Sequence, residues 1–187
     1  SLTGAPYQAD FVLGRVQFKG EKDSGYQDLK KDFVVQEGSF IRTGKNSMVK
    51  LLDAQGNRMM ILANTTFRIV PAGEKEQVME ILAGASEFRP RKGEVFSVRT
   101  PTLSAGVRGT LFRVSYEPGG NESVVVYEGK VAVSSPVHTD KGELLIEEGS
   151  KFQWVPAQET FSSFLIQAAT EQDLDFYLKD GIAAPKT

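Results

Sequence analysis

Residues 96–114 read FSVRTPTLSAGVRGTLFRV and contain the most distinctive pattern in the chain. Apolar and polar residues alternate on both sides of a Thr-Pro pair, which predicts two strands joined by a constrained connection. Pro101 fixes its own φ, and Gly106 and Gly109 permit a close backbone path. Arg108 has five hydrogen-bond donors, enough to tie several loop carbonyls together. We therefore expect a buried or half-buried Arg108 that organises a turn, with direct ligand contact as the alternative.

The same two-residue period extends over most of the chain and predicts an all-β fold. Two apolar runs, 48–52 and 58–62, are separated by turn residues and indicate a β-hairpin. Further strands are expected at 11–18, 66–70, 77–82, 95–100, 110–116, 123–127, 131–134, 144–146 and 151–155. Two architectures fit many short strands at irregular spacing: an irregular β-sandwich or a short β-helical stack.

The C-terminal region has a different pattern, which predicts one short α-helix at about 170–180. The sequence from Thr170 to Asp173 resembles a capping box, and Leu174, Tyr177 and Leu178 follow at helical spacing. Gly181 stands where a left-handed residue would end this helix. We see no internal boundary, so residues 1–187 are expected to form a single domain with its core at about 12–155 and a C-terminal extension.

Composition excludes several classes of protein. The 187 residues are 40% hydrophobic and 25% charged, values typical of a folded domain, and the chain has no cysteine for disulfides or cysteine-ligated metal. The formal net charge of -2 gives no general attraction to phosphate backbones, so no nucleic-acid partner is expected. No stretch approaches 18 consecutive apolar residues, so no transmembrane helix is expected in this chain.

The sequence contains no coherent catalytic set, and we expect no enzymatic activity, no metal and no cofactor. His138 is the only histidine, lies in a polar stretch and is expected in an exposed loop. Nucleophile-elbow, phosphate-loop and dinucleotide-binding motifs are all absent from the sequence. Paired carboxylates could cleave glycosides, but Glu147 and Glu148 point to opposite faces of a strand, and Asp173 and Asp175 are expected on an exposed helix face.

The only dense basic cluster is Arg89-Pro90-Arg91-Lys92. Phe88 and Phe96 flank it, which is compatible with base stacking, but four residues make a small electrostatic footprint on an acidic chain. We expect an exposed loop between strands. Arg89, Arg91 and Lys92 are candidate contacts for an acidic partner protein.

Three segments resemble the FecR family of bacterial iron-dicitrate regulators. The first is the strand that leads into Thr-Pro and then Val-Arg-Gly-Thr-x-Phe-x-Val; the others are 38–51, with its Thr-Gly and Ser, and 125–133, with its Glu-Gly-x-Val. The resemblance covers about 12–155. Its signature residues, expected to be structural, are Thr100, Pro101, Val107, Arg108, Gly109, Thr110 and Phe112.

The resemblance implies a mostly β domain that lies outside the cytoplasmic membrane and serves sensing or protein interaction. We therefore expect a periplasmic or otherwise extracytoplasmic domain that binds an envelope protein or relays the occupancy of a cell-surface receptor. The alternative is a cell-wall or carbohydrate-binding envelope module. Its stacking surfaces would be aromatic residues such as Trp154 or Tyr127, although both are better suited to a core.

Overall fold

The protein is a stack of short β-strands. The computed structural model describes residues 6–73, 75–155 and 164–179, and within them the only helical element is the 3₁₀ turn Thr139–Lys141. The strands are β1 (Tyr7–Leu13), β2 (Val16–Lys19), β3 (Gln27–Asp28), β4 (Val34–Val35), β5 (Phe40–Thr43), β6 (Met48–Asp53), β7 (Arg58–Ile61), β8 (Thr66–Val70), β9 (Glu76–Arg89), β10 (Val95–Arg99), β11 (Ser104–Val107), β12 (Leu111–Tyr116), β13 (Glu122–Glu128), β14 (Lys130–Ser134), β15 (Leu144–Glu147), β16 (Ser150–Trp154) and β17 (Phe164–Ala168). The predicted all-β class is confirmed.

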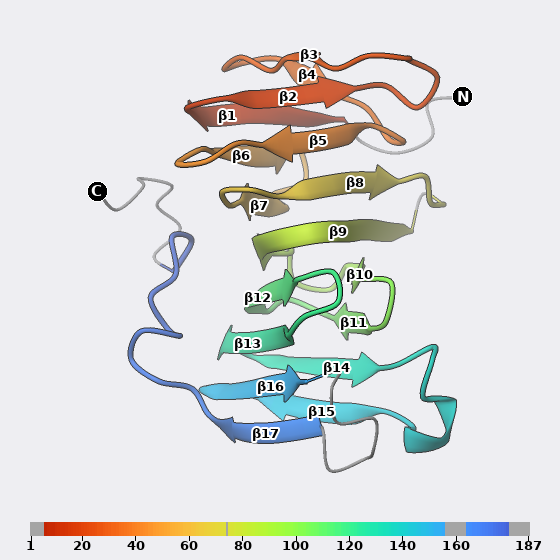
Figure 1. Cartoon of the computed structure of the whole chain (residues 1–187), viewed down its shortest axis with the longest axis vertical. Coiled ribbons are helices and arrows are strands. Elements are labelled where there is room, and N and C mark those ends of the chain that lie inside the picture. The colour runs from red at the N-terminus through yellow and green to blue at the C-terminus, as the bar shows by residue number, and fades with distance from the viewer. Residues whose placement is uncertain (1–5, 74, 156–163, 180–187) are drawn as a thin grey trace.

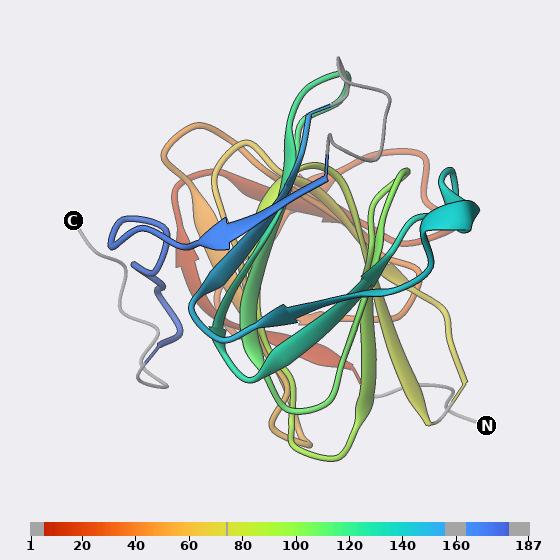
Figure 2. The same ribbon diagram turned by 90° about the horizontal axis from the view of Figure 1, so that it is seen from below.

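The strands form two sheets that face each other across one core (Figures 1 and 2). Sheet A has the spatial order β4, β1, β6, β7, β9, β12, β13, β16, β17. Sheet B has the order β3, β2, β5, β8, β9, β10, β11, β14, β15. Apart from the first few strands, both orders follow the chain. The molecule is therefore an irregular sandwich built as a stack, which combines the two predicted architectures.

Strand β9 belongs to both sheets. Its first part pairs with β8 and, in parallel, with β10 in sheet B, whereas Gly84–Arg89 pair with β7 and β12 in sheet A. The strand changes sheet at Gly84, whose φ is +102°, and a Cβ on that residue would lie 2.6 Å from the Cα of Thr65. Only glycine fits this bend without strain.

The core follows from the alternation of side chains. Inward-facing residues of both sheets form one continuous buried cluster that runs from Tyr7 and Ile41 to Phe152 and Trp154. The predicted hairpin is β6 and β7, and the Asp53 carboxylate accepts the main-chain N–H of Asn57 at 2.8 Å in its turn. None of the described segments is a helix with the length and apolar character needed to cross a membrane.

The prediction of a C-terminal helix at about 170–180 is wrong. The capping box does form, because Asp173 N donates to Thr170 Oγ1 at 3.1 Å and Thr170 N donates to Asp173 Oδ2 at 2.9 Å. However, side chains from sheet A bind the main-chain carbonyls and amides that would otherwise form the hydrogen bonds of a helix. Arg113 donates to the carbonyls of Asp173 and Asp175 at 3.0 and 3.1 Å.

The main-chain amides of the same segment also bond to a side chain of sheet A. Tyr177 N and Leu178 N donate to the Glu87 carboxylate at 2.8 and 3.1 Å, so neither makes a helical bond to the residue four positions earlier. Residues 171–174 are a turn and 177–179 are bends and turns. The predicted terminator Gly181 lies outside the described residues.

Candidate functional site

The Thr-Pro pair of the signature forms the turn between β10 and β11. Thr100 Oγ1 accepts the main-chain N–H of Leu103 at 2.9 Å, and the two residues also exchange a main-chain hydrogen bond. The hydroxyls of Thr100 and Thr102 both donate to the carboxylate of Glu122, on strand β13 of sheet A. These bonds tie the turn of one sheet to the other. Thr100 therefore stabilises the fold, and Pro101 lies exposed in the turn.

The Val-Arg-Gly-Thr part of the signature is the crossing from sheet B to sheet A. Val107 ends β11 in the core, and Phe112 enters β12 with its ring stacked on Phe88, at 5.3 Å between centroids. Between them Gly109 has φ +67°, and a Cβ there would lie 3.0 Å from the Cα of Lys92. The signature glycine thus lets the crossing pass close to the 90–94 loop.

Arg108 does not have the predicted position. Ala105 and Val107 point into the core, so the strand alternation carries Arg108 outward, and the residue is exposed. Its guanidinium makes no hydrogen bond or ion pair to any residue that the structure describes. The expectation of a buried or half-buried Arg108 that organises the turn is therefore wrong.

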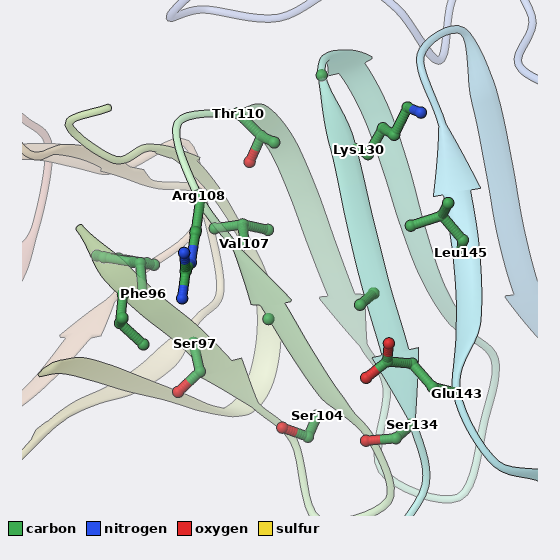
Figure 3. A pocket seen from close by; sticks show the side chains of 14 residues that line it. Phe96, Ser97, Ser104, Val107, Arg108, Thr110, Lys130, Ser134, Glu143 and Leu145 are labelled. Atoms are coloured by element: carbon green, nitrogen blue, oxygen red, sulfur yellow. The ribbon is translucent and has the colours of Figure 1, made fainter. Parts of the chain in front are cut away.

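A groove crosses the outer face of sheet B beside Arg108, with a volume of about 620 Å³ (Figure 3). Its floor is one cross-strand row of small residues, since Ser97 pairs with Gly106 and Gly106 with Ala132. The row ends at Leu145, which is 53% exposed and pairs with Ala132. This floor presents a smooth surface with an aliphatic side chain at one side.

The two ends of the groove differ in charge. Arg108 and Lys130 lie at one end, where Lys130 makes a long contact of 3.8 Å with the exposed Glu147. Glu143 and Ser134 lie at the other end. Because Arg108 and Lys130 are both exposed, the first end is a cationic site open to solvent.

The cationic end of the groove also contains the buried hydroxyl group of Thr110. Only 2% of the residue is exposed, it lines the groove, and Figure 3 shows its hydroxyl directed toward the Val107 side of the groove. Thr110 Oγ1 has no hydrogen-bond partner among the described residues. Buried hydroxyls are nearly always paired, so this one is a candidate contact for a bound group.

The predicted basic cluster begins in strand β9, which ends at Arg89, and its other residues lie in the 90–94 loop between β9 and β10. Arg89 is not free, because its guanidinium forms two hydrogen bonds of 3.2 Å with the Glu128 carboxylate, and this contact is the main reason that the pKa of Glu128 lies below its usual value. Arg91 and Lys92 have exposed side chains. The loop itself is fixed, since Arg91 N donates to Asn57 Oδ1 at 2.8 Å. Of the three candidates, Arg91 and Lys92 are thus accessible to a partner.

The aromatic residues of the carbohydrate-binding alternative are occupied by packing. Trp154 is 7% exposed within the core cluster, and Tyr127 packs against Phe176 with ring centroids 5.5 Å apart. His138 is half-buried in its loop, with its ring edge-on to Trp154 at 5.3 Å. Trp154 is thus buried in the core, whereas Tyr127 is half-buried and packs against a residue of the C-terminal segment.

The acidic residues considered in the sequence differ in exposure. Glu147 and Glu148 are exposed, whereas Asp173 is half-buried and pairs with Lys151 at 3.2 Å, contrary to the exposed helix face expected for it. No group of three or more His, Cys, Asp or Glu residues within the described ranges is arranged to hold a metal ion.

The sequence did not single out two of the most highly connected side chains, Glu87 and Arg113. Both stand at outward positions of alternating strands, where a charged residue usually faces water. Glu87 is fully buried, however, and pairs with Arg113 at 2.9 Å beneath the C-terminal segment. No local pattern distinguishes them from ordinary surface charges, because the covering segment lies 60 or more residues away.

Comparisons with known proteins agree with this architecture. A family model described as FecR protein matches residues 39–132, which include the signature and the floor of the groove. Two crystal structures of a protein described as an anti-sigma factor from Parabacteroides distasonis ATCC 8503 have TM-scores of 0.61 and 0.63 at 20% sequence identity. The alignments cover 71% and 74% of this chain and 61% and 63% of those chains, so the chain spans about three fifths of their length. At this identity the likeness concerns the fold. No curated protein matches the chain.

Proposed function

Because the chain belongs to the FecR family, we propose that it is a non-enzymatic regulatory domain that acts outside the cytoplasm, binds a partner protein of the cell envelope and relays a cell-surface signal. The groove on sheet B is the proposed partner-binding surface. The observation that carries this proposal is the cationic end of the groove, where Arg108 is exposed without a described partner and the buried hydroxyl of Thr110 is unpaired.

The chemistry of the groove indicates the kind of partner segment that it accepts. A floor of glycine, alanine and serine admits close approach of an extended chain, and Leu145 offers an apolar contact beside it. A carboxylate at the cationic end would receive charge-assisted hydrogen bonds from Arg108 and Lys130. Arg91 and Lys92 lie on the adjacent loop and would steer an acidic partner, an effect that salt screens over about 8 Å at physiological ionic strength.

The regulatory role is supported by the family and by the fold shared with the anti-sigma factor structures. The carbohydrate-binding alternative has less support, since Trp154 and Tyr127 are packed against other residues.

Photo-crosslinking in the native host tests the site. A photoreactive amino acid replaces Leu145, a large side chain that is 53% exposed beside the floor, so the small residues of the floor stay unchanged. We expect a discrete crosslinked protein, and we expect it to disappear when Arg108 and Lys130 become serine. Gly25, which has open surroundings on a distant loop, is the control position. Crosslinks to glycan alone, or equal crosslinking from both positions, would contradict the proposal.

Protease accessibility tests the location. The domain is expected to be cleaved when protease is added to cells whose outer layers have been permeabilised and whose cytoplasmic membrane is intact. Protection until the cytoplasmic membrane is lysed would contradict an extracytoplasmic domain.

A further inference from the structure

The C-terminal segment 170–179 crosses the outer face of sheet A without joining it. Figures 1 and 2 show this segment after β17, running along the outside of the stack. Its main-chain hydrogen bonds are local, from Leu174 to Thr170, from Asp175 to Gln172 and from Phe176 to Leu174. The last described main-chain bond to the sheet is from Ala169 N to Gly149 O at 2.8 Å. Among the described residues, side chains alone hold the segment beyond this point.

The segment follows a single row of side chains across the strands. Lys151 of β16 pairs with Val125, Val125 with Arg113, Arg113 with Glu87 and Glu87 with Met60 of β7. In a sheet, residues paired in this way share one face. The row therefore forms a continuous track with a cation at one end, an ion pair in the middle and an apolar residue at the other end.

The middle of this track binds main-chain groups of the segment. Glu87 Oε1 accepts two successive amides, from Tyr177 and Leu178, at 2.8 and 3.1 Å. Arg113 donates to the carbonyls of Asp173 and Asp175 while its other hydrogen bonds go to Glu87 Oε2. Because these contacts are made to main-chain groups, they select the backbone conformation of the bound segment more than the identity of its side chains.

Apolar anchors supply the rest of the contact. Phe176 and Leu178 are completely buried in a cluster separate from the main core, together with Met48, Met60, Leu111 and Val125 of the sheet. The Arg113 guanidinium lies 4.2 Å from the Phe176 ring centroid, a cation–π contact. At the other end Asp173 pairs with Lys151 at 3.2 Å.

We propose that this outer face of sheet A is a peptide-binding site, which residues 170–179 close and which a segment of a partner protein occupies when they leave. The residues that bind the segment come from strands that stay paired without it, so the site persists when it opens. When the segment leaves, Glu87 and Arg113 remain paired with each other and become solvated, so neither charge is left buried without a partner. Because residues 170–179 make no described main-chain bond to a strand, they can leave without breaking a ladder.

The partner segment is defined by the chemistry of the track. It carries an acidic residue for Lys151, a turn that presents two adjacent amides to Glu87, and an aromatic and an aliphatic residue two positions apart for the apolar cluster. The site differs in sheet and in chemistry from the groove beside Arg108, so the two proposals stand independently.

A peptide-exchange experiment tests the proposal on the full chain. The double variant Phe176→Ala/Leu178→Ala weakens the resident segment but leaves every residue of the track intact. A fluorescein-labelled peptide with the sequence of residues 169–179 is the probe. We expect saturable binding to the double variant and at least roughly tenfold weaker binding to the wild type, whose tethered segment competes at high effective concentration.

Two controls make the outcome specific. Adding Arg113→Ala to the double variant is expected to abolish binding, and a scrambled peptide is expected not to bind. Circular dichroism and thermal melting establish that each variant is folded. A folded double variant that does not bind the peptide, or equal binding to wild type and variant, would overturn the proposal. Concentration-dependent dimers of the wild type that the double variant lacks would also overturn it, because they would assign the site to segments exchanged between two copies.

Discussion

Glu122 shows how a single buried carboxylate connects the two sheets. It is 1% exposed on β13 and accepts hydrogen bonds from the hydroxyls of Thr100 and Thr102 in the β10–β11 turn. Burial raises the pKa of Glu122, and the two hydroxyls offset this rise in part. The Thr-Pro part of the signature is therefore bonded to a group that is sensitive to pH.

Substitution of Glu122 by glutamine is expected to change the pH dependence of stability. Because the pKa of Glu122 is higher in the folded than in the unfolded state, its contribution is fully present below the unfolded pKa and is lost as pH rises through the folded pKa. The stability advantage of the wild type over Glu122→Gln should thus shrink from pH 4 to pH 7, by about 1.4 kcal/mol per unit of pKa difference. Urea denaturation of both proteins across this range measures it.

A matched change at an exposed acid is the control. Glu117 is exposed, so Glu117→Gln removes the same charge from the chain without removing a bond between the two sheets. A pH profile of Glu122→Gln that runs parallel to that of the wild type would show that the buried carboxylate does not titrate differently on folding.

The bend of β9 determines how the two sheets are joined. At Gly84 the strand leaves sheet B for sheet A, while Thr65 Oγ1 accepts the N–H of Ala85 at 3.1 Å and so fixes the bend from the side. Any Cβ at this position would collide with Thr65 and would also require a positive φ.

Gly84→Ala is therefore expected to destabilise the protein by roughly 3 kcal/mol or more, because backbone strain and overpacking act together. Gly106→Ala is the comparison, since a Cβ there meets no atom within 4 Å and the backbone is ordinary strand. Gly106→Ala should leave the midpoint nearly unchanged or raise it. Similar midpoints for both variants in chemical denaturation would mean that β9 tolerates a different path.

Local sequence determines some elements of this fold but not others, for physical reasons. The two-residue period is local, so it predicts strands such as 48–52 and 58–62 and the turn between them. The C-terminal pattern from Thr170 to Leu178 also has helical spacing, and its capping box forms. The helix fails because Glu87 and Arg113, distant in sequence, offer stronger partners to its main chain.

The candidate site was predicted in part for the same reason. The signature segment marks where the chain crosses between the sheets, and the positions of its turn and glycines follow from local chemistry. The outward direction of Arg108 depends on the register of β11, and the groove depends on four strands being placed side by side. Neither is encoded in a local pattern.

At the scale of the whole molecule, one core extends through the full length of the stack. The same buried cluster contains Ile41 near the N-terminal end and Trp154, the only tryptophan, near the C-terminal end. Strand β9 connects the two halves within both sheets. We therefore expect the domain to unfold as one cooperative unit.

Ile41→Ala tests this continuity. Removing a completely buried isoleucine is expected to cost roughly 2–5 kcal/mol, and the transition followed by Trp154 fluorescence should shift as far as that followed by circular dichroism. A tryptophan transition that stays at the wild-type midpoint would instead show that the two halves unfold separately.

The order of the strands also has a consequence for how the protein is made. From β5 onward, each sheet adds its strands in the order in which they occur in the chain, so almost every new strand pairs with one that has already been synthesised. A chain that emerges N-terminus first can therefore assemble this stack progressively while its C-terminal part is still missing. Even the widest pairing among the described strands, Tyr7 with Asp53, leaves most of the chain outside the loop that it closes, which limits the loop-closure entropy. The segment that closes the outer face of sheet A follows every strand beneath it in the chain, so it is synthesised after them.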